Sequence, residues 1–362
     1  MANTAIFLGG GASAAEGAPL QNDLFKEYFK SLRENESSHN YEMQRELASF
    51  FAFIFNIDVD NSSLENVQFP TFEECLGIID LAERRKESLK GFELENMASN
   101  SDRLRFIRLY LIMLMAKIID DKLKESKGYH KSLVEKLKEI NYLKNTIFIS
   151  TNYDILIDNA LTYIHLPNQE TQLDYGVDFT NFRKPNDWTR PGLNAIKLYK
   201  LHGSLNWLYC PTCNELTLTP LEKGVVRKLM YDFSEASCEN CESVIVPIIV
   251  PPTFFKDMNN VYLSIIWNKA ELALREVEHI IFCGYSFPDA DMHIKYLLKR
   301  IQTNRNNPIK ITVCNNHSCK KEIIAQEEEL RFKRFLGVNV NYTNYSFQDF
   351  VNNIEQFYVE QN

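Results

Sequence analysis

Two Cys-x-x-C pairs, Cys210/Cys213 and Cys238/Cys241, are the residues of this chain whose spacing most strongly indicates chemistry. Each pair can hold one side of a metal ion, and two pairs complete a tetrahedral thiolate site of the kind that binds Zn²⁺. Four thiolates leave no coordination position for water, so such a metal is structural and not catalytic. The pattern predicts a small zinc-ribbon module over residues 207–245, and the paired spacing disfavours four incidental cysteines.

A histidine stands a few residues before the first of these cysteines. His202 precedes Gly203 at the predicted end of a strand, and Asn152 and Asp154 follow another predicted strand. An imidazole can act as a base toward a sugar hydroxyl near neutral pH, and an asparagine can orient a water molecule or a ribose. Together they could cleave the bond between nicotinamide and ribose. In the simpler interpretation His202 is a loop residue, and Asn152 and Asp154 begin a helix, where both residue types are favoured.

Three glycines, Gly9, Gly10 and Gly11, follow the first apolar stretch of the chain, residues 3–8. Glycines at this position let backbone N–H groups approach a pyrophosphate near the positive end of a following helix. This indicates nucleotide binding, although the same residues could form an ordinary tight turn. The spacing is not G-x-G-x-x-G, because position 14 is alanine.

Bringing these residues together requires a particular order of elements. Apolar, β-rich stretches alternate with helical ones, which predicts a doubly wound, Rossmann-like, mostly parallel sheet. A helix is expected from about Pro19, another over 261–276 and a last one over 347–358. In such sheets ligands bind beyond the carboxyl ends of the strands, where each polar cluster of this chain falls. The predicted strands lie within 3–8, 146–150, 195–207, 243–252, 278–284, 310–316 and 337–345.

A helical block interrupts this alternation. Four segments between Tyr41 and Lys144 carry apolar residues at helical spacing, and Thr71 and Ser101-Asp102 are typical helix starts. We therefore predict a Rossmann-like domain made of residues 1–40 and 146–362, with a helical insertion over 41–145.

Composition limits the classes of function. The chain has 362 residues, 45% of them apolar, and a formal net charge of −8, so it can form a sizeable core and is unsuited to broad nucleic-acid binding. The sequence contains no run of 18 apolar residues, so no membrane span is predicted. The N-terminal residues lack the pattern of a signal peptide. We expect a cytoplasmic protein without direct nucleic-acid binding.

The motifs, taken in order, resemble the sirtuin family. The stretch GGGAS (9–13) resembles its Gly-Ala-Gly-x-Ser loop, GAP (17–19) its Gly-Ile-Pro and TNYD (151–154) its Gln-Asn-Ile-Asp. LHGS (201–204) resembles its catalytic His-Gly, which a zinc ribbon follows. CGYS (283–286) resembles its Gly-Thr-Ser ribose loop, and CNN (314–316) the late asparagine that contacts adenosine.

The resemblance implies NAD⁺ as substrate. His202 would be the base on the ribose, Asn152 would position the nicotinamide ribose and a water molecule, and Asp154 would contact the carboxamide side. The residues implied to bind the dinucleotide are Gly10, Gly11, Ala12, Ser13, Thr151, Asn152, Asp154, Gly284, Ser286 and Asn315.

Departures from the family pattern bear on the activity. Leu20-Gln21-Asn22 replace the family's Asp-Phe-Arg, and Thr151 replaces its glutamine. The missing aromatic residue normally shields the reactive sugar from water. The helical block is also longer than a protein deacylase needs. We therefore expect hydrolysis of NAD⁺ to nicotinamide and ADP-ribose.

Within the family, STNYD and GYSFPDAD are most similar to sirtuin-like effectors of bacterial anti-phage systems, which deplete NAD⁺. The chain's size is similar to the form that is paired with a HerA-type hexameric ATPase. That resemblance implies regulation by the ATPase or by oligomerisation. The apolar stripes of the helical block make it the simplest source of contacts for a homo-oligomer. Three alternatives stay open: an NAD-dependent protein deacylase, a non-catalytic subunit that senses NAD⁺ or ADP-ribose, and a zinc-ribbon nucleic-acid binder, which the acidic balance disfavours.

Overall fold

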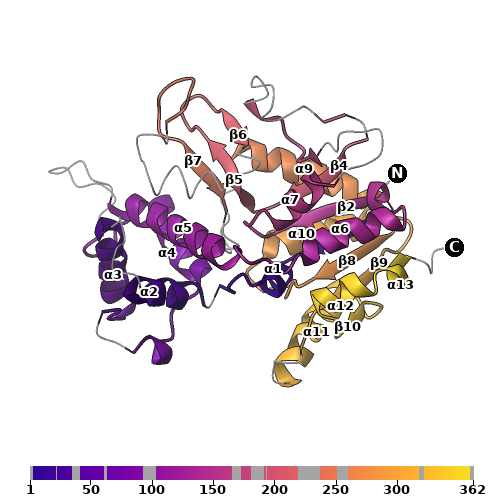
Figure 1. Ribbon diagram of the computed structural model, residues 1–362, viewed down its shortest axis with the longest axis horizontal. Coiled ribbons are helices and arrows are strands. Elements are labelled where there is room, and N and C mark those ends of the chain that lie inside the picture. Colours follow the sequence, from indigo (N-terminus) through magenta and orange to yellow (C-terminus); the bar gives the residue numbers. More distant parts are fainter. Residues whose placement is uncertain are drawn as a thin grey trace.

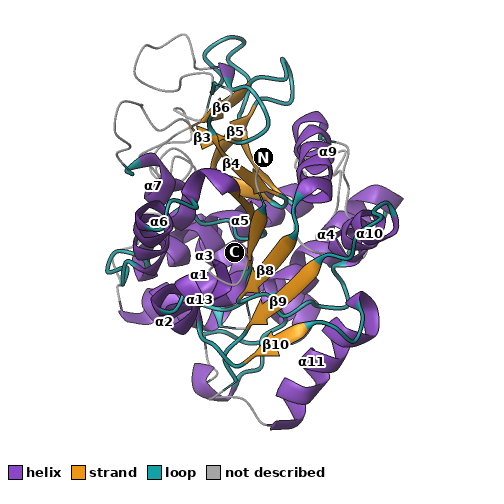
Figure 2. Cartoon of the chain, turned by 90° about the vertical axis from the view of Figure 1, so that its right-hand side faces the viewer, coloured by secondary structure: helices purple, strands orange, loops and turns teal. Residues whose placement is uncertain are grey.

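Seven parallel strands form the central sheet of the computed structural model, in the order β10-β9-β8-β1-β2-β4-β3 (Figure 2). The strands are β1 (Thr4–Leu8), β2 (Thr146–Ser150), β3 (Leu173–Asp174), β4 (Ile196–Lys200), β8 (His279–Cys283), β9 (Lys310–Cys314) and β10 (Asn341–Thr343). The structure describes residues 3–21, 23–34, 41–60, 63–92, 103–164, 173–180, 191–192, 194–218, 237–250, 260–317 and 322–358.

Helices cover both faces of this sheet, which confirms the predicted doubly wound α/β fold (Figures 1 and 2). One face carries α1 (Gly10–Glu16), α6 (Tyr129–Glu139), α7 (Leu156–Thr162), α12 (Phe347–Asn352) and α13 (Glu355–Tyr358). The other carries α9 (Val261–Glu276), α10 (Met292–Thr303) and α11 (Glu322–Leu336). The strands β1, β2 and β8 are buried along their whole length, as their continuous apolar sequences require in a sheet covered twice.

The chain leaves the parallel sheet at His202-Gly203. It then forms a separate antiparallel sheet of β5 (Gly203–Tyr209), β6 (Leu216–Leu218) and β7 (Val246–Ile249), in the order β6-β5-β7. Gly203 has a φ of +84°, and a Cβ on it would lie 1.9 Å from the carbonyl oxygen of Ile248. Only glycine fits this turn, so the glycine after His202 serves the change from one sheet to the other.

A helical block lies beside the sheet (Figure 1) and has its own apolar core. It comprises α2 (Leu24–Glu34), α3 (Tyr41–Phe55), the short 3₁₀ turn η1 (Leu64–Asn66), α4 (Phe72–Arg85) and α5 (Arg103–Lys122). Thr71 begins α4 through a capping box with Glu74, which agrees with the helix start read from the sequence. The second expected start, Ser101-Asp102, lies outside the described residues.

The packing shows limits for the helical block that differ from the predicted ones, residues 41 and 145. Helix α2 contributes Phe25 and Phe29 to the block's core, whereas α6 contributes Leu133 and Val134 to the core of the sheet. The core of the block also continues into the antiparallel sheet through Leu205, Leu208, Cys210, Cys238, Ile245 and Ile249. The block and the cysteine-bearing sheet are therefore packed as one unit.

Two local predictions need correction. No helix begins at Pro19: α1 begins at Gly10 and ends at Glu16, and α2 begins at Leu24, so two of the three glycines form the first turn of α1. The reason is that α1 is short and alanine-rich and that its glycines allow close backbone packing, which a loop interpretation did not consider. The last helix, expected as one, is divided into α12 and α13 by a turn at Asn353.

Among the described residues, no helix combines the length and the apolar character that crossing a bilayer requires.

Candidate functional site

A cavity of about 620 Å³ opens beyond the carboxyl ends of the parallel strands. Segments that follow β1, β2, β4, β8 and β9 line one side of it. The other side is formed by the segment 18–21 and by residues of the helical block. The predicted site residues that line the cavity are Gly10, Gly11, Ser13, Thr151, Asn152, Asp154, His202, Gly284, Ser286 and Asn315. Ala12 does not line it, because its side chain is fully buried in the core behind the turn.

The glycines of the first turn have two different tasks. Gly284 has a φ of +64°, and a Cβ on it would lie 2.2 Å from the backbone nitrogen of Ala12. The Gly11 N–H donates a 2.7 Å hydrogen bond to the Gly284 carbonyl, and a Cβ on Gly11 would lie 2.8 Å from the Gly284 Cα. These glycines thus pack the turn after β1 against the loop after β8. A Cβ on Gly10 would meet no atom within 4 Å, so this glycine leaves space in the cavity.

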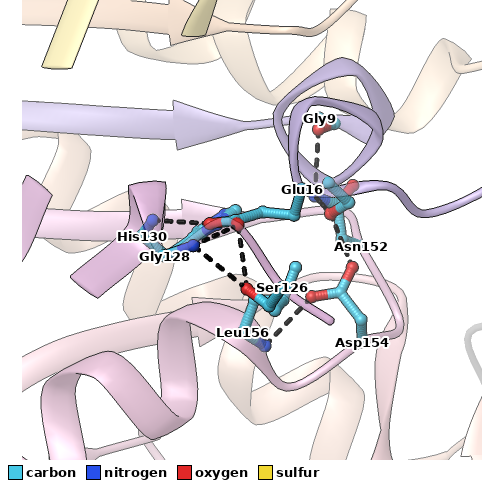
Figure 3. A network of polar contacts seen from close by, with 9 residues as sticks. Gly9, Glu16, Ser126, Gly128, His130, Asn152, Asp154 and Leu156 are labelled. Atoms are coloured by element: carbon cyan, nitrogen blue, oxygen red, sulfur yellow. Dashed lines mark hydrogen bonds and ion pairs between the residues drawn. The ribbon is translucent and has the colours of Figure 1, made fainter. Parts of the chain in front are cut away.

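Side chains after β2 are fixed to the same turn (Figure 3). The Asn152 amide nitrogen donates to the Gly9 carbonyl at 2.9 Å and to the Ser13 hydroxyl at 2.8 Å. The Ser13 hydroxyl donates to the Asp154 carboxylate at 2.6 Å, and the other oxygen of Asp154 accepts from the Leu156 N–H at 3.1 Å. Asp154 therefore accepts from the first N–H of α7 but is not its N-cap residue, which is Ile155, while Asn152 binds the glycine turn instead.

The buried ammonium group of Lys200 supports the loop after β2. The Lys200 ammonium, with no exposed surface, donates to the backbone carbonyl of Asp154 and lies 3.1 Å from the carboxylate of Asp158. The Tyr175 hydroxyl donates to the same carboxylate at 2.7 Å. A buried ion pair with satisfied hydrogen bonds holds one geometry, so these residues fix where Asn152 and Asp154 point. Lys200, Asp158 and Tyr175 were not among the predicted site residues, because a lysine inside a strand gives no sign of its partner.

Glu16 anchors the far end of α1 (Figure 3). Its buried carboxylate accepts hydrogen bonds of 2.8 Å from the backbone N–H groups of Gly128 and His130 and from the Ser126 hydroxyl. The His130 ring nitrogen Nδ1 lies 2.9 Å away. Burial alone would raise the pKa of Glu16, but the hydrogen bonds from His130 and Ser126 outweigh it and lower the pKa to about 2. The helix that carries Ser13 is therefore tied to the start of α6.

His202 lies at the other side of the cavity and is almost completely buried. Its Nε2 is 3.6 Å from a carboxylate oxygen of Asp291, and the Tyr285 hydroxyl donates to the other oxygen of Asp291 at 2.6 Å. The ring of Tyr153 has its centroid 6.4 Å from that of His202. Burial raises the pKa values of Tyr153 and Tyr285 above their usual range, so both phenols stay protonated near neutral pH.

The segment that follows β9 lines a further part of the cavity. The Asn315 amide nitrogen donates to the Tyr285 carbonyl at 2.8 Å and to the carboxylate of Glu328, which also accepts from the Tyr342 hydroxyl at 2.9 Å. The Asn315 amide oxygen is buried and has no hydrogen-bond partner among the described residues. A buried acceptor of this kind is normally satisfied, so this oxygen is available to a donor from water or from a ligand.

The helical block closes the cavity opposite the sheet. Leu24, Phe72, Met115 and Ile119 supply apolar surface, and Glu73 at the start of α4 supplies a carboxylate. The Gln21 amide donates to Glu73, which ties the segment after α1 to the block. Glu73, Asp291 and Glu328 were not among the predicted site residues. The motif GYSFPDAD contained Asp291, but nothing in the sequence placed two acidic residues of separate helices at this cavity.

The four predicted metal ligands lie together at the end of the antiparallel sheet. All four Sγ atoms are within 4.8 Å of one another, with 3.4 Å between Cys210 and Cys241 and 3.5 Å between Cys213 and Cys238. A tetrahedral zinc with bonds of about 2.3 Å needs sulfur atoms about 3.8 Å apart. The four cysteines could therefore hold a Zn²⁺ ion.

The two cysteine turns have the same backbone pattern. The N–H of Asn214 bonds to the carbonyl of Cys210 at 2.9 Å, and the N–H of Glu242 bonds to that of Cys238 at 2.8 Å. Asn214 and Glu242 each have a φ near +60°. Such matched turns fit two equivalent knuckles around one metal. The segment that joins them, 219–236, lies outside the described residues.

Comparison with known proteins gave one family match. The profile of the SIR2-like domain matches residues 146–333, which is just over half of the chain. A comparison with curated proteins found no match. Among solved structures, the chain is similar to a Sir2 complex with a p53 peptide and NAD⁺, at 14% identity and a TM-score of 0.45, covering 98% of this chain and 92% of that one. It is also similar to Sir2Tm bound to a propionylated peptide, at 14% identity and a TM-score of 0.41, with the same two coverages.

Proposed function

Because the chain belongs to the SIR2-like domain family, we propose that it is an NAD⁺ hydrolase that releases nicotinamide and ADP-ribose. The observation that carries the proposal is the meeting of Asn152 and His202, from two separate strand ends, in one cavity with the glycine turn. The cavity volume of about 620 Å³ falls in the range of small-molecule sites. The buried, unpartnered oxygen of Asn315 offers an acceptor for a ribose or adenine donor.

The charges of the cavity suit the proposed reaction. Among the described residues, its lining includes four carboxylates and no lysine or arginine; the carboxylates are Glu73, Asp154, Asp291 and Glu328. NAD⁺ carries its positive charge on the nicotinamide ring, and an oxocarbenium-like sugar forms when this ring leaves. Carboxylates in a partly water-excluded site stabilise such developing positive charge. The pyrophosphate would be held by backbone N–H groups beside Gly10, where the missing side chain leaves space.

The proposed step is a simple hydrolysis. The bond between the ribose C1′ and the nicotinamide nitrogen breaks, and both of its electrons stay with the ring, which leaves as neutral nicotinamide. A water oxygen forms the new bond to C1′, and the proton that is lost passes to a ring nitrogen of His202 and then to solvent. Asn152 would orient the ribose and the water. Its amide nitrogen already binds Gly9 and Ser13, so its position is fixed before the substrate binds.

Two features favour water over an acylated lysine as the acceptor. The segment after α1 presents Leu20 and Gln21, and Gln21 is bound to Glu73 of the helical block. No aromatic side chain from this segment stands between the cavity and water. In addition, Phe72, Met115 and Ile119 of the block occupy a wall of the cavity. We infer that this apolar wall leaves less room for a peptide beside the dinucleotide.

The test is NAD⁺ turnover by the purified chain without any peptide, followed by chromatography of the products. We expect equal amounts of nicotinamide and ADP-ribose, and loss of turnover in His202→Ala and in Asn152→Ala. Asn353→Ala, in a half-buried turn after α12 and outside the lining of the cavity, serves as the matched control. Turnover that begins only when an acyl-lysine peptide is added would support the deacylase. Bound NAD⁺ or ADP-ribose without turnover would support a sensing subunit.

We also propose, from the resemblance of the motifs, that the hydrolysis serves anti-phage defence in the bacterial cytoplasm. There the protein would form a homo-oligomer and act with a HerA-type hexameric ATPase. The helical block supports an assembly role through exposed aromatic residues such as Tyr41, Phe53 and Phe106. Co-purification with such an ATPase, and loss of phage protection in His202→Ala cells, would test this setting. Protection that survives the substitution would reject NAD⁺ depletion as the effector activity.

A further inference from the structure

Asp291 occupies the N-cap position of α10 but makes no capping hydrogen bond. Aspartate is favoured at this position because its carboxylate accepts from the N–H groups of the first turn. Here one carboxylate oxygen accepts from the Tyr285 hydroxyl at 2.6 Å, and the other lies 3.6 Å from Nε2 of His202. The side chain is turned away from its own helix and toward the site.

The surroundings of Asp291 hold its carboxylate in place and favour its negative charge. The residue is 1% exposed, and the positive end of the twelve-residue helix α10 stabilises a negative charge at its N-cap. Burial and the charge of Asp291 both raise the pKa of Tyr285, so this phenol stays protonated and donates. The distance of 3.6 Å to His202 exceeds that of a hydrogen bond, so the contact is one of charge and strengthens when the imidazole is protonated.

We propose that Asp291 is a positioning residue for His202: it holds the imidazole toward the cavity and stabilises its protonated form. The role rests on the proposed NAD⁺ hydrolysis. When an O–H bond of water or of a ribose hydroxyl breaks, the electron pair stays on oxygen and the proton joins a ring nitrogen of His202. The positive charge then lies beside the Asp291 carboxylate. Charge formed next to a fixed partner lowers the cost of the transfer.

Other titratable groups line the same cavity as His202. Glu73 comes from the start of α4, Tyr153 and Asp154 from the loop after β2, and Tyr285 from the loop after β8. The charges of Glu73 and Asp291 both raise the pKa of Tyr153, after burial, and keep this phenol neutral. Farther away, Asp80 and Arg108 form an ion pair of 2.8 Å. Asp291 is the carboxylate in direct contact with the imidazole.

The test compares Asp291→Asn with Asp289→Asn in the full chain. Asp289 belongs to the same loop, but its side chain is 65% exposed and pairs with Lys295. Loss of a negative charge beside His202 lowers the pKa of the imidazole, so Asp291→Asn should move the acidic limb of the pH–rate profile about one unit down. We expect NAD⁺ turnover to fall about tenfold to a hundredfold, because the variant loses only part of the rate enhancement that a general base contributes. Asp289→Asn should change neither quantity.

A second readout does not depend on turnover. The chain has seven histidines, so the ring resonance of His202 in an NMR titration is the one absent from His202→Ala. Asp291→Asn should lower its titration midpoint by about one unit, and Asp291→Glu should keep it nearer the wild-type value. If the asparagine variant does not fold, Asp291→Ser keeps a favoured N-cap residue without the charge.

The outcomes separate the two proposals. Lower turnover with an unchanged pH limb and an unchanged His202 titration would show a purely structural role and overturn the positioning role. A wild-type chain that does not hydrolyse NAD⁺ would reject the proposed function, while the NMR titration would still decide whether Asp291 controls the charge of His202.

Discussion

The Ser13 hydroxyl donates a 2.6 Å hydrogen bond to the Asp154 carboxylate, across a sequence separation of 141 residues. The same hydroxyl accepts a 2.8 Å hydrogen bond from Asn152. One side chain therefore joins the turn after β1 to the loop after β2. The proposed site depends on this junction, because it sets the positions of both Asn152 and Asp154 relative to the glycine turn.

Removal of this hydroxyl should loosen the site. Ser13→Ala leaves the buried Asp154 carboxylate with one donor fewer and should lower the free energy of unfolding by about 1–3 kcal/mol. NAD⁺ turnover should fall with it, because Asn152 loses one of its two anchors. Urea unfolding and turnover measure the two effects. Ser31→Ala, whose hydroxyl bonds to a carbonyl within α2, is the control. Equal behaviour of the two variants would contradict a role for the junction.

Two glycines of the cavity should respond in opposite ways to the same substitution. Gly284→Ala places a Cβ 2.2 Å from a backbone nitrogen at a φ of +64°, and should lower the free energy of unfolding by about 2–4 kcal/mol. Gly10→Ala meets no atom within 4 Å and should fold normally. Its methyl group would enter the space proposed for the pyrophosphate, so the KM for NAD⁺ should rise. A normal KM in Gly10→Ala would place the pyrophosphate elsewhere.

Zinc should stabilise more than the antiparallel sheet. Cys210 and Cys238 belong to the same apolar core as the helical block, so metal removal should lower the melting temperature of the whole unit. We expect about one zinc per chain, lost in Cys213→Ser together with about 5 °C or more of melting temperature. Metal analysis and calorimetry provide the measurements. Cys75→Ala changes a buried cysteine of the block and should retain the metal. A chain purified without metal and unaffected by chelators would argue against the site.

Glu16 should make stability dependent on acid pH. Its pKa in the folded chain is about 2, below the ordinary 4.5, so its contribution is complete above pH 4.5 and is lost as the pH falls toward 2. The shift corresponds to about 3 kcal/mol. Glu16→Gln should be less stable than wild type at pH 7, and the difference should shrink between pH 4.5 and 2. Urea unfolding across this range tests it, with the exposed Glu125→Gln as control. A constant difference would show that the carboxylate charge is not the cause.

Local sequence was sufficient for most of the strands and for the polar positions that follow them. Continuous apolar stretches such as 146–150 predict strands buried on both faces, and a turn must follow where the polar residues begin. The cysteine spacing likewise carried its own geometry, because two residues between cysteines suffice for a knuckle turn. These features depend on neighbouring residues in the chain, so they can be predicted without knowledge of the tertiary structure.

The tertiary structure alone decided which distant groups share the cavity. Glu73, Asp291 and Glu328 come from three helices, and no local spacing relates them to His202. It also decided the tasks of the glycines, since Gly284 is needed for its approach to Ala12 as well as for its positive φ. Sequence pattern reflects burial and hydrogen bonding within a segment. Contacts between segments depend on the order of strands in the sheet and on where the helical block packs, which no single segment records.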